Sequence, residues 1–162
     1  MHLTVRELMS YTAEERGRWE RWFRENGDEM LVTPIAGPRE TTIGQLVMHI
    51  FGAELNFAQR LRYEPVTAYR GLPSGSVDAV FGYGMKSRQT MREFVEGLAQ
   101  GDWERVLEFA IDEWQPRVTV RKAVCHVYIH EIRHWAQVAS LARERGFAPP
   151  DEDDLLFSGA LE

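Results

Sequence analysis

Three histidines, His126, His130 and His134, stand four residues apart in a segment with helical periodicity. Each four-residue step turns a helix only about 40° beyond a full turn, so neighbouring members share one face. Two imidazoles placed in this way can bind one metal ion, and the spacing recurs in metal sites. Imidazole suits zinc, nickel, copper and iron, so we predict one divalent transition-metal ion, with zinc or nickel favoured.

A third ligand must come from another helix, because two ligands on one helix cannot close a tetrahedral shell. The chain has five histidines, of which His2 lies at the N-terminus. His49 flanks the apolar stripe of an earlier helical segment, so we expect its ring at the interior edge of the fold. We therefore predict that His49, His130 and His134 bind the ion, with His126 as a reserve ligand.

Three protein ligands leave positions open on the ion, which is more typical of catalytic than of structural sites. A metal ion can lower the pKa of water or of a thiol. Glu54 and Arg133 are candidates for contacts around the site or to a substrate, although helix-surface charge is the favoured interpretation of both. Cys125 points about 100° away from His126 on the helix and is interpreted as a small hydrophobe. The sequence therefore assigns no catalytic residue.

His130-Glu131-Xaa-Xaa-His134 also matches the short His-Glu-Xaa-Xaa-His pattern of zinc proteases. A protease of that class needs a further ligand downstream, and no histidine follows His134. The chain is also small for a peptide cleft. We therefore interpret Glu131 as an exposed helix carboxylate and expect a small-molecule substrate.

Four helical segments would position these residues. They run from Leu3 to Asn26, from Thr42 to about Leu61, from Ser76 to about Gln100 and from Thr119 to Arg145. Capping boxes are expected at residues 4–7 and 42–45, and Gly17 could break the first helix. Residues 106–111 and 117–120 have strand character and predict a short hairpin. The tail is expected to be extended and to pack Leu155, Leu156 and Phe157. The fold class predicted is an all-α four-helix bundle with a short β-hairpin before the last helix.

The composition bounds the remaining possibilities. The 162 residues suit one domain spanning 1–162, and the net charge of −6 argues against a general nucleic-acid binder. Arg16, Arg18, Arg21 and Arg24 alternate with glutamates and are interpreted as a solvated helix face. No apolar run nears the roughly 20 residues that span a bilayer, and no signal peptide is evident, so we expect a cytoplasmic protein.

Five tryptophans are many for a chain of this length. Aromatic residues are enriched at the centres of protein interfaces, which favours a homodimer. A tryptophan-rich core would account for them almost as well.

Two stretches resemble the motifs of a known family. Thr42-Ile43-Gly44-Gln45-Leu46-Val47-Met48-His49-Ile50-Phe51-Gly52-Ala53-Glu54 looks like the second-helix motif of the DinB/YfiT-like proteins. Val124-Cys125-His126-Val127-Tyr128-Ile129-His130-Glu131-Ile132-Arg133-His134-Trp135-Ala136-Gln137 looks like their fourth-helix motif. The resemblance implies a four-helix bundle of that type, with a divalent metal held by His49, His130 and His134. Where the family commonly has Arg-Gly-Gln after the last histidine, this chain has Trp135-Ala136-Gln137.

The resemblance also implies a function, which is a metal-dependent transferase that uses a low-molecular-weight thiol. Two alternatives stay open on the sequence: a non-catalytic metal-binding or stress-response protein, and a metal-dependent hydrolase in which water replaces the thiol. In many members His126 corresponds to a histidine that is not a ligand, so we expect it to form a hydrogen bond or to pack in the core.

Overall fold

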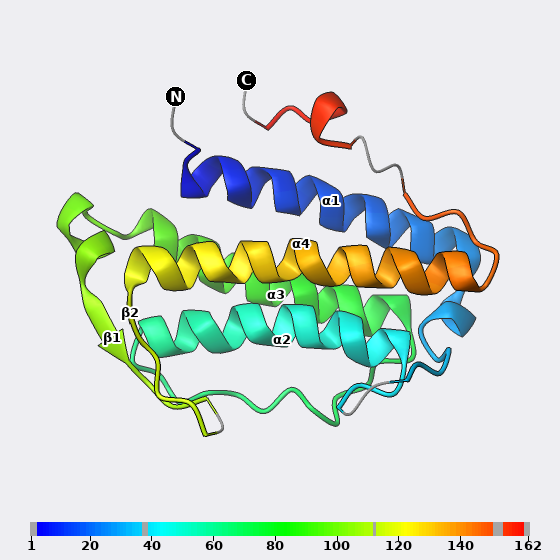
Figure 1. The fold of residues 1–162 in the computed structure, drawn as a ribbon, viewed down its shortest axis with the longest axis horizontal. Helices are drawn as coiled ribbons and strands as arrows, with labels where there is room; N and C mark the ends of the chain where they lie inside the picture. The colour runs from blue at the N-terminus through cyan, green and yellow to red at the C-terminus, as the bar shows by residue number, and fades with distance from the viewer. Residues whose placement is uncertain (1–2, 37–38, 112, 151–153, 161–162) are drawn as a thin grey trace.

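The protein is a four-helix bundle with one short β-hairpin, as the sequence predicts (Figure 1). The computed structural model describes residues 3–36, 39–111, 113–150 and 154–160. The long helices are α1 (Val5–Asn26), α2 (Ile43–Leu61), α3 (Val77–Glu96) and α4 (Val120–Glu144). None of the helices in these ranges is long and apolar enough to cross a membrane.

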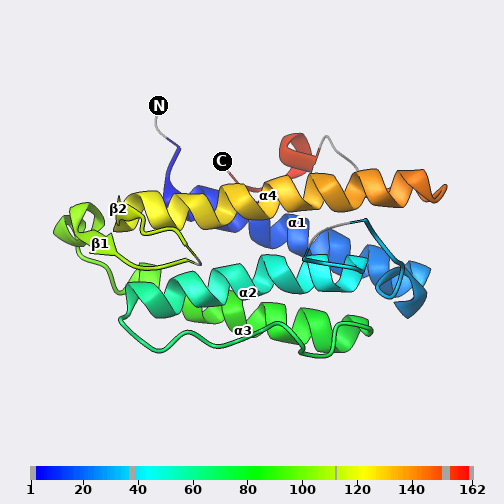
Figure 2. The same cartoon turned by 60° about the horizontal axis from the view of Figure 1, so that its bottom comes forward.

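The helices form a closed ring in which α1 and α2 each contact both α3 and α4. Figures 1 and 2 show α4 beside both α1 and α2, with α3 on the other side of the bundle. The helix that carries His49 is therefore a direct neighbour of the helix that carries His130 and His134. The α2–α3 loop, residues 62–76, runs back along the length of the bundle (Figure 1).

The helix starts follow from capping chemistry. The hydroxyl of Thr4 accepts a hydrogen bond from Glu7 N, and the Glu7 carboxylate accepts one from Thr4 N, which confirms the first capping box. At α2, Thr42 caps in the same way, but the Gln45 side chain accepts from Thr41 N, one residue before the cap. The prediction of a second capping box is therefore wrong, because the Gln45 side chain does not accept a hydrogen bond from the N-cap nitrogen of Thr42. Helix α1 continues through Gly17 without a break.

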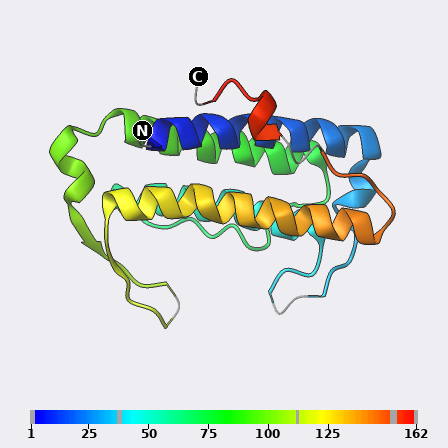
Figure 3. The same cartoon turned by 45° about the horizontal axis from the view of Figure 1, so that its top comes forward.

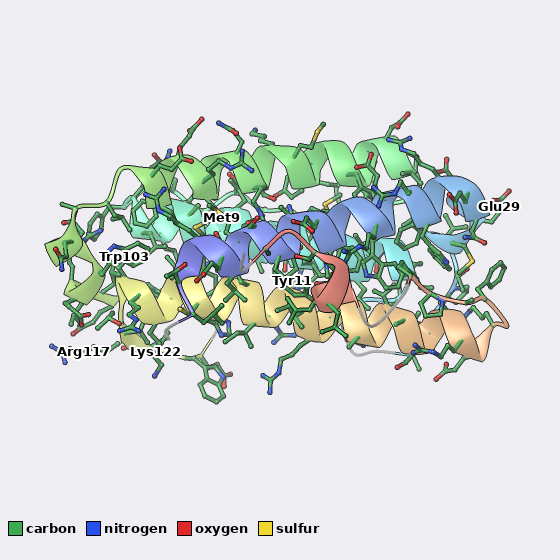
Figure 4. The ribbon with its side chains drawn as sticks, turned by 90° about the horizontal axis from the view of Figure 1, so that it is seen from above. Met9, Tyr11, Glu29, Trp103, Arg117 and Lys122 are labelled. Carbon is green, nitrogen blue, oxygen red and sulfur yellow. The ribbon has the colours of Figure 1, made fainter. Side chains whose placement is uncertain are left out.

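The hairpin joins β1 (Val106–Glu108) to β2 (Arg117–Thr119), with Leu107 opposite Val118. Figure 4 shows Trp103, Arg117 and Lys122 at this end of the bundle and Glu29 at the other. Helix α3 ends at Glu96, earlier than predicted, and a short 3-10 helix, η2 (Gln100–Glu104), follows it.

The tail differs from the prediction. It contains a 3-10 turn, η3 (Asp154–Phe157), where an extended segment was predicted. Leu155 and Leu156 are exposed, so the prediction that they pack is wrong for both. The predicted packing of Phe157 lies outside the described side chains. Instead, Ser158 and Ala160 are buried.

Three of the five tryptophans lie in the core. Trp19, Trp22 and Trp135 are buried, and Trp19 stacks on Trp135 with ring centroids 5.1 Å apart. Trp114, by contrast, is 77% exposed near the hairpin. The core therefore explains much of the tryptophan content, and the homodimer stays a prediction.

Candidate metal centre

The imidazoles of His49, His130 and His134 converge on one point between α2 and α4. His130 Nε2 lies 3.2 Å from His49 Nε2 and 3.1 Å from His134 Nε2. A ligand nitrogen from each of the three rings lies within 4.8 Å of the others. The structure thus brings together the three residues that the sequence singled out, although metal binding by them stays a prediction.

The nitrogen spacing fits a transition-metal ion. Bonds of about 2.0–2.1 Å place neighbouring ligand nitrogens about 3.3 Å apart around a tetrahedral ion and about 3.0 Å apart around an octahedral one. The two separations of 3.1 and 3.2 Å fall between these values. The donor set and these two separations are therefore compatible with one divalent ion that has open positions.

The outer nitrogens of two of these rings already have partners. His49 Nδ1 lies 2.8 Å from the Tyr69 hydroxyl and 3.5 Å from a carboxylate oxygen of Glu40. His134 Nδ1 donates to Gln137 Oε1 at 3.0 Å. Acceptors at Nδ1 favour the tautomer that carries its proton there and leaves a lone pair on Nε2. One proton on His130 Nε2 can satisfy only one of the two facing lone pairs, and this arrangement is compatible with a bound cation.

Burial favours the neutral form of the His49 and His130 imidazoles. Desolvation lowers the pKa of His130 to about 3, helped by the neighbouring His134 and His49. Burial also lowers the pKa of His49; the Glu40 carboxylate opposes this shift, and the cationic side chain of Arg70 adds to it. Because a metal binds the neutral ring, the environment favours the ligand-competent form near neutral pH.

A close approach at Gly52 holds Tyr69 in place. Any Cβ on Gly52 would lie 2.3 Å from Cγ of the Tyr69 ring, so only glycine lets the α2–α3 loop lie this near α2. The side chain of Gln59 then fixes the loop by accepting from Thr67 N at 2.9 Å and donating to Thr67 Oγ1 at 2.7 Å. The hydrogen bond between Tyr69 and His49 depends on this packing.

His126 lies one turn before His130 but is not part of the converging set. Its ring is exposed, with its centroid 5.3 Å from that of Phe57 and 5.7 Å from that of His130. The predicted core packing of His126 is therefore wrong, and the side chain faces the opening beside the site.

Four charged side chains form a buried ion cluster under the histidines, one from each helix. Arg16 donates to both Glu131 and Glu54, at 2.8 and 3.1 Å from Nη2. Arg88 donates to Glu131 at 2.6 Å and forms an ion pair with Glu54 at 2.7 Å. Trp135 Nε1 also donates to Glu131. Two positive and two negative charges thus balance inside the bundle.

This cluster corrects three interpretations made from the sequence. Glu54 and Glu131 are each only 1% exposed, and Arg16 is buried rather than part of a solvated face. Arg133, in contrast, is exposed, as expected for surface charge. Burial raises the pKa of Glu131, but the positive charges of Arg16 and Arg88 lower it by a larger amount. The pKa of Glu131 therefore lies below its usual value. The carboxylate therefore stays ionised next to His130.

The position of Arg16 in the apolar stripe of the first helix indicates burial, although the glutamates next to it in the chain suggest a solvated face. On α1, Thr12, Arg16, Trp19 and Phe23 recur every three or four residues and all are buried. A charged residue in an otherwise core-facing stripe indicates burial with a partner, whatever the neighbouring charges are.

A cavity of ≈ 440 Å³ opens beside the histidines. α2 and α4 supply part of its wall, and the α2–α3 loop, the hairpin turn and the segment before α2 supply the rest. Figure 3 shows the hairpin and the segment that leads into α2 projecting on the same side of the α2–α4 pair. His49, His126 and His130 line this cavity, so a bound ion would be accessible to a small molecule.

The fold and the site together define a class of protein, a helical bundle in which three histidines converge between two of the helices. The model of the DinB family matches residues 1–160, and the chain belongs to that family.

Two solved structures share this fold. A DinB-like protein from Bacillus cereus is 19% identical, with a TM-score of 0.71, and the match covers 93% of this chain and 99% of that chain. A DinB-like protein from Bacillus subtilis is 17% identical, with a TM-score of 0.62, covering 91% and 94%. No curated protein matches the chain.

Proposed function

We propose that the protein binds one divalent transition-metal ion through His49, His130 and His134 and is a metal-dependent transferase for a low-molecular-weight thiol. The observation that supports the ion is the convergence of three Nε2 atoms on one point, where burial lowers the pKa of both His49 and His130. Family membership supports the fold and the placement of the site.

The chain's own residues would prepare the site in two ways. Tyr69 and Gln137 orient two of the imidazoles through Nδ1, which directs Nε2 toward the ion. The buried ion cluster fixes Glu131, and with it the turn of α4 that carries His130 and His134. A bound divalent ion would lower the pKa of a thiol, which makes sulfur a stronger nucleophile at neutral pH.

In the reaction proposed, the thiol sulfur forms a bond to an electrophilic carbon, whose leaving group departs with the electron pair. The thiol proton passes to solvent. The open cavity beside the histidines gives both reactants access. A hydrolase would use water in place of the thiol, and a metal-binding protein without turnover would use the same ligands; both remain alternatives to be tested.

Elemental analysis of the purified protein, followed by a conjugation assay, tests this proposal. We expect about one equivalent of zinc or nickel, removed by a chelator. With L-cysteine as the thiol and 1-chloro-2,4-dinitrobenzene as the electrophile, conjugation should stop on chelation and return with metal. Metal content without turnover of any thiol would favour the binding protein.

Four alanine variants test the ligand assignment. His49→Ala, His130→Ala and His134→Ala should each lose the metal. His126→Ala should keep it, because its ring lies outside the converging set. A protein that lost its metal through His126→Ala but kept it through His134→Ala would overturn the assignment.

Light scattering on the wild-type protein would test the predicted homodimer, and a monomer mass at all concentrations would reject it.

A further inference from the structure

The cavity beside the histidines has a distinct charge. Its described lining includes three arginines, Arg39, Arg60 and Arg70, and no acidic residue. Glu40 lies at its edge, 3.5 Å from His49 Nδ1 and in the wall of a neighbouring cavity. The lining thus stays net positive even when Glu40 is counted. At ≈ 440 Å³ the cavity has a volume typical of small-molecule sites, which span roughly 300–1,000 Å³.

The face of α2 sets the length of this cavity. His49, Ala53 and Arg60 stand four and seven residues apart, which places them on one side of the helix. The eleven residues from His49 to Arg60 correspond to about 16 Å along the axis. The histidines therefore lie toward one end of this face and a guanidinium toward the other.

Aromatic rings hold that guanidinium. Arg60 Cζ lies 5.8 Å from the centroid of Phe57 and 5.5 Å from that of Phe109, a cation–π arrangement. Apolar side chains of Phe57, Val66 and Ile111 also line the cavity. The walls thus combine fixed positive charge with apolar surface.

We propose that this cavity binds a small organic anion, with its carboxylate or phosphate group on the arginines and its carbon body against the apolar wall. The planar guanidinium suits both oxyanions, since it can donate two parallel hydrogen bonds. The proposal names the chemical class of a substrate for the proposed function. Binding of the anion does not depend on that function, whereas any reaction of the bound anion rests on it.

Calorimetric titration of the full chain tests the proposal with matched probes. Phenylacetate and its neutral counterpart phenylacetamide differ in charge at similar size, and phenyl phosphate supplies the other oxyanion. We expect at least one anion to bind and the amide to bind at least tenfold more weakly. Whichever anion binds more tightly identifies the oxyanion. Equal binding of the amide and both anions would overturn the proposal.

Arginine variants locate the anion. Arg60→Gln and Arg70→Gln should each weaken binding of the anionic probe by about tenfold to a hundredfold, because each loses a charged hydrogen-bond donor. Arg92→Gln removes the same charge from an exposed position on α3 and should leave binding unchanged. Circular dichroism would establish that every variant is folded. Equal affinities for all three variants would refute the role of the arginines.

Titrations of the metal-loaded and the chelated protein separate this proposal from the metal-dependent function. Binding that persists after chelation supports recognition by the arginines, even if no transferase activity is ever found. Anion binding that disappears on chelation, in protein that is still helical, would place the anion on the metal and overturn the proposal.

Discussion

Arg16 and Glu131, 115 positions apart in the chain, form a two-pronged ion pair in the centre of the bundle. Arg16 Nε donates to Glu131 Oε1 at 3.0 Å and Nη2 donates to Oε2 at 2.8 Å. The pair joins the first helix to the last, directly beside the candidate ligand His130. Removing one partner from such a pair leaves a buried charge without its counterpart, which is the costly event in a protein interior.

Glu131→Gln should therefore lower the free energy of unfolding by about 3–5 kcal/mol, the range for breaking a buried ion pair. Urea unfolding of the metal-free protein at neutral pH measures it. Glu144→Gln, an exposed change on the same helix, should have an effect below about 0.5 kcal/mol. Equal stability of the two variants would show that the buried ion cluster contributes little.

Tyr69→Phe should weaken metal binding about 10- to 100-fold, the usual cost of losing a partner that orients a ligand imidazole. The variant keeps the ring and removes only the hydroxyl that bonds to His49 Nδ1. Competition with a zinc-sensitive dye gives the affinity. Tyr63→Phe, which removes an exposed hydroxyl bonded to Arg105, is the control and should keep the wild-type value.

Gly52→Ala should also weaken metal binding, because the new methyl group cannot coexist with the Tyr69 ring in its present position. The loop must move, and its hydrogen bond to His49 is lost. Gly82→Ala is a matched control, since no atom outside its own helix turn and chain neighbours lies within 4 Å of a Cβ there. It should stabilise α3 by up to about 1 kcal/mol without any effect on the metal. An unchanged affinity in Gly52→Ala would contradict the role given to the loop.

The metal-free protein should lose stability as the pH falls from 7 to 5. Burial lowers the pKa of His130 to about 3, whereas in the unfolded chain a histidine titrates near about 6.5. Between these values the unfolded state binds more protons than the folded state, so the free energy of unfolding rises with pH. The contribution of His130 to that free energy is fully present above about pH 6.5 and is lost progressively as the pH falls below it. Burial lowers the pKa of His49 and His126 as well, which adds to the trend.

Urea midpoints in the presence of a chelator at pH 5, 6 and 7 measure this dependence. His130→Gln removes one titrating group and should flatten the slope. A variant slope as steep as that of the wild type would show that His130 does not contribute.

Local patterns predicted the helices well, because a helix start is decided by a few adjacent residues. Thr119 was predicted to cap the last helix, and its hydroxyl accepts from Lys122 N. The four-residue spacing of His130 and His134 also determines their common face, independently of any tertiary contact. Their convergence with His49 follows once α2 and α4 are neighbours.

The parts that the sequence did not predict depend on contacts between distant segments. Arg16 was interpreted from the glutamates next to it in the chain, whereas its partners are on α2, α3 and α4. Tyr69 lies in a loop with no periodicity, and its place depends on a missing side chain at Gly52. Neither local charge nor local propensity records which loop will lie on which helix.

The residues that line the cavity come from two kinds of segment, helices and the connections between them. Helices α2 and α4 supply His49, Arg60 and His130, whereas Arg39, Thr67, Arg70 and Ile111 come from connecting segments. Connecting segments accept substitutions and insertions more readily than packed helices do. A change in which small molecule the cavity prefers could therefore evolve through substitutions in the loops alone, while the bundle and its histidines are inherited intact.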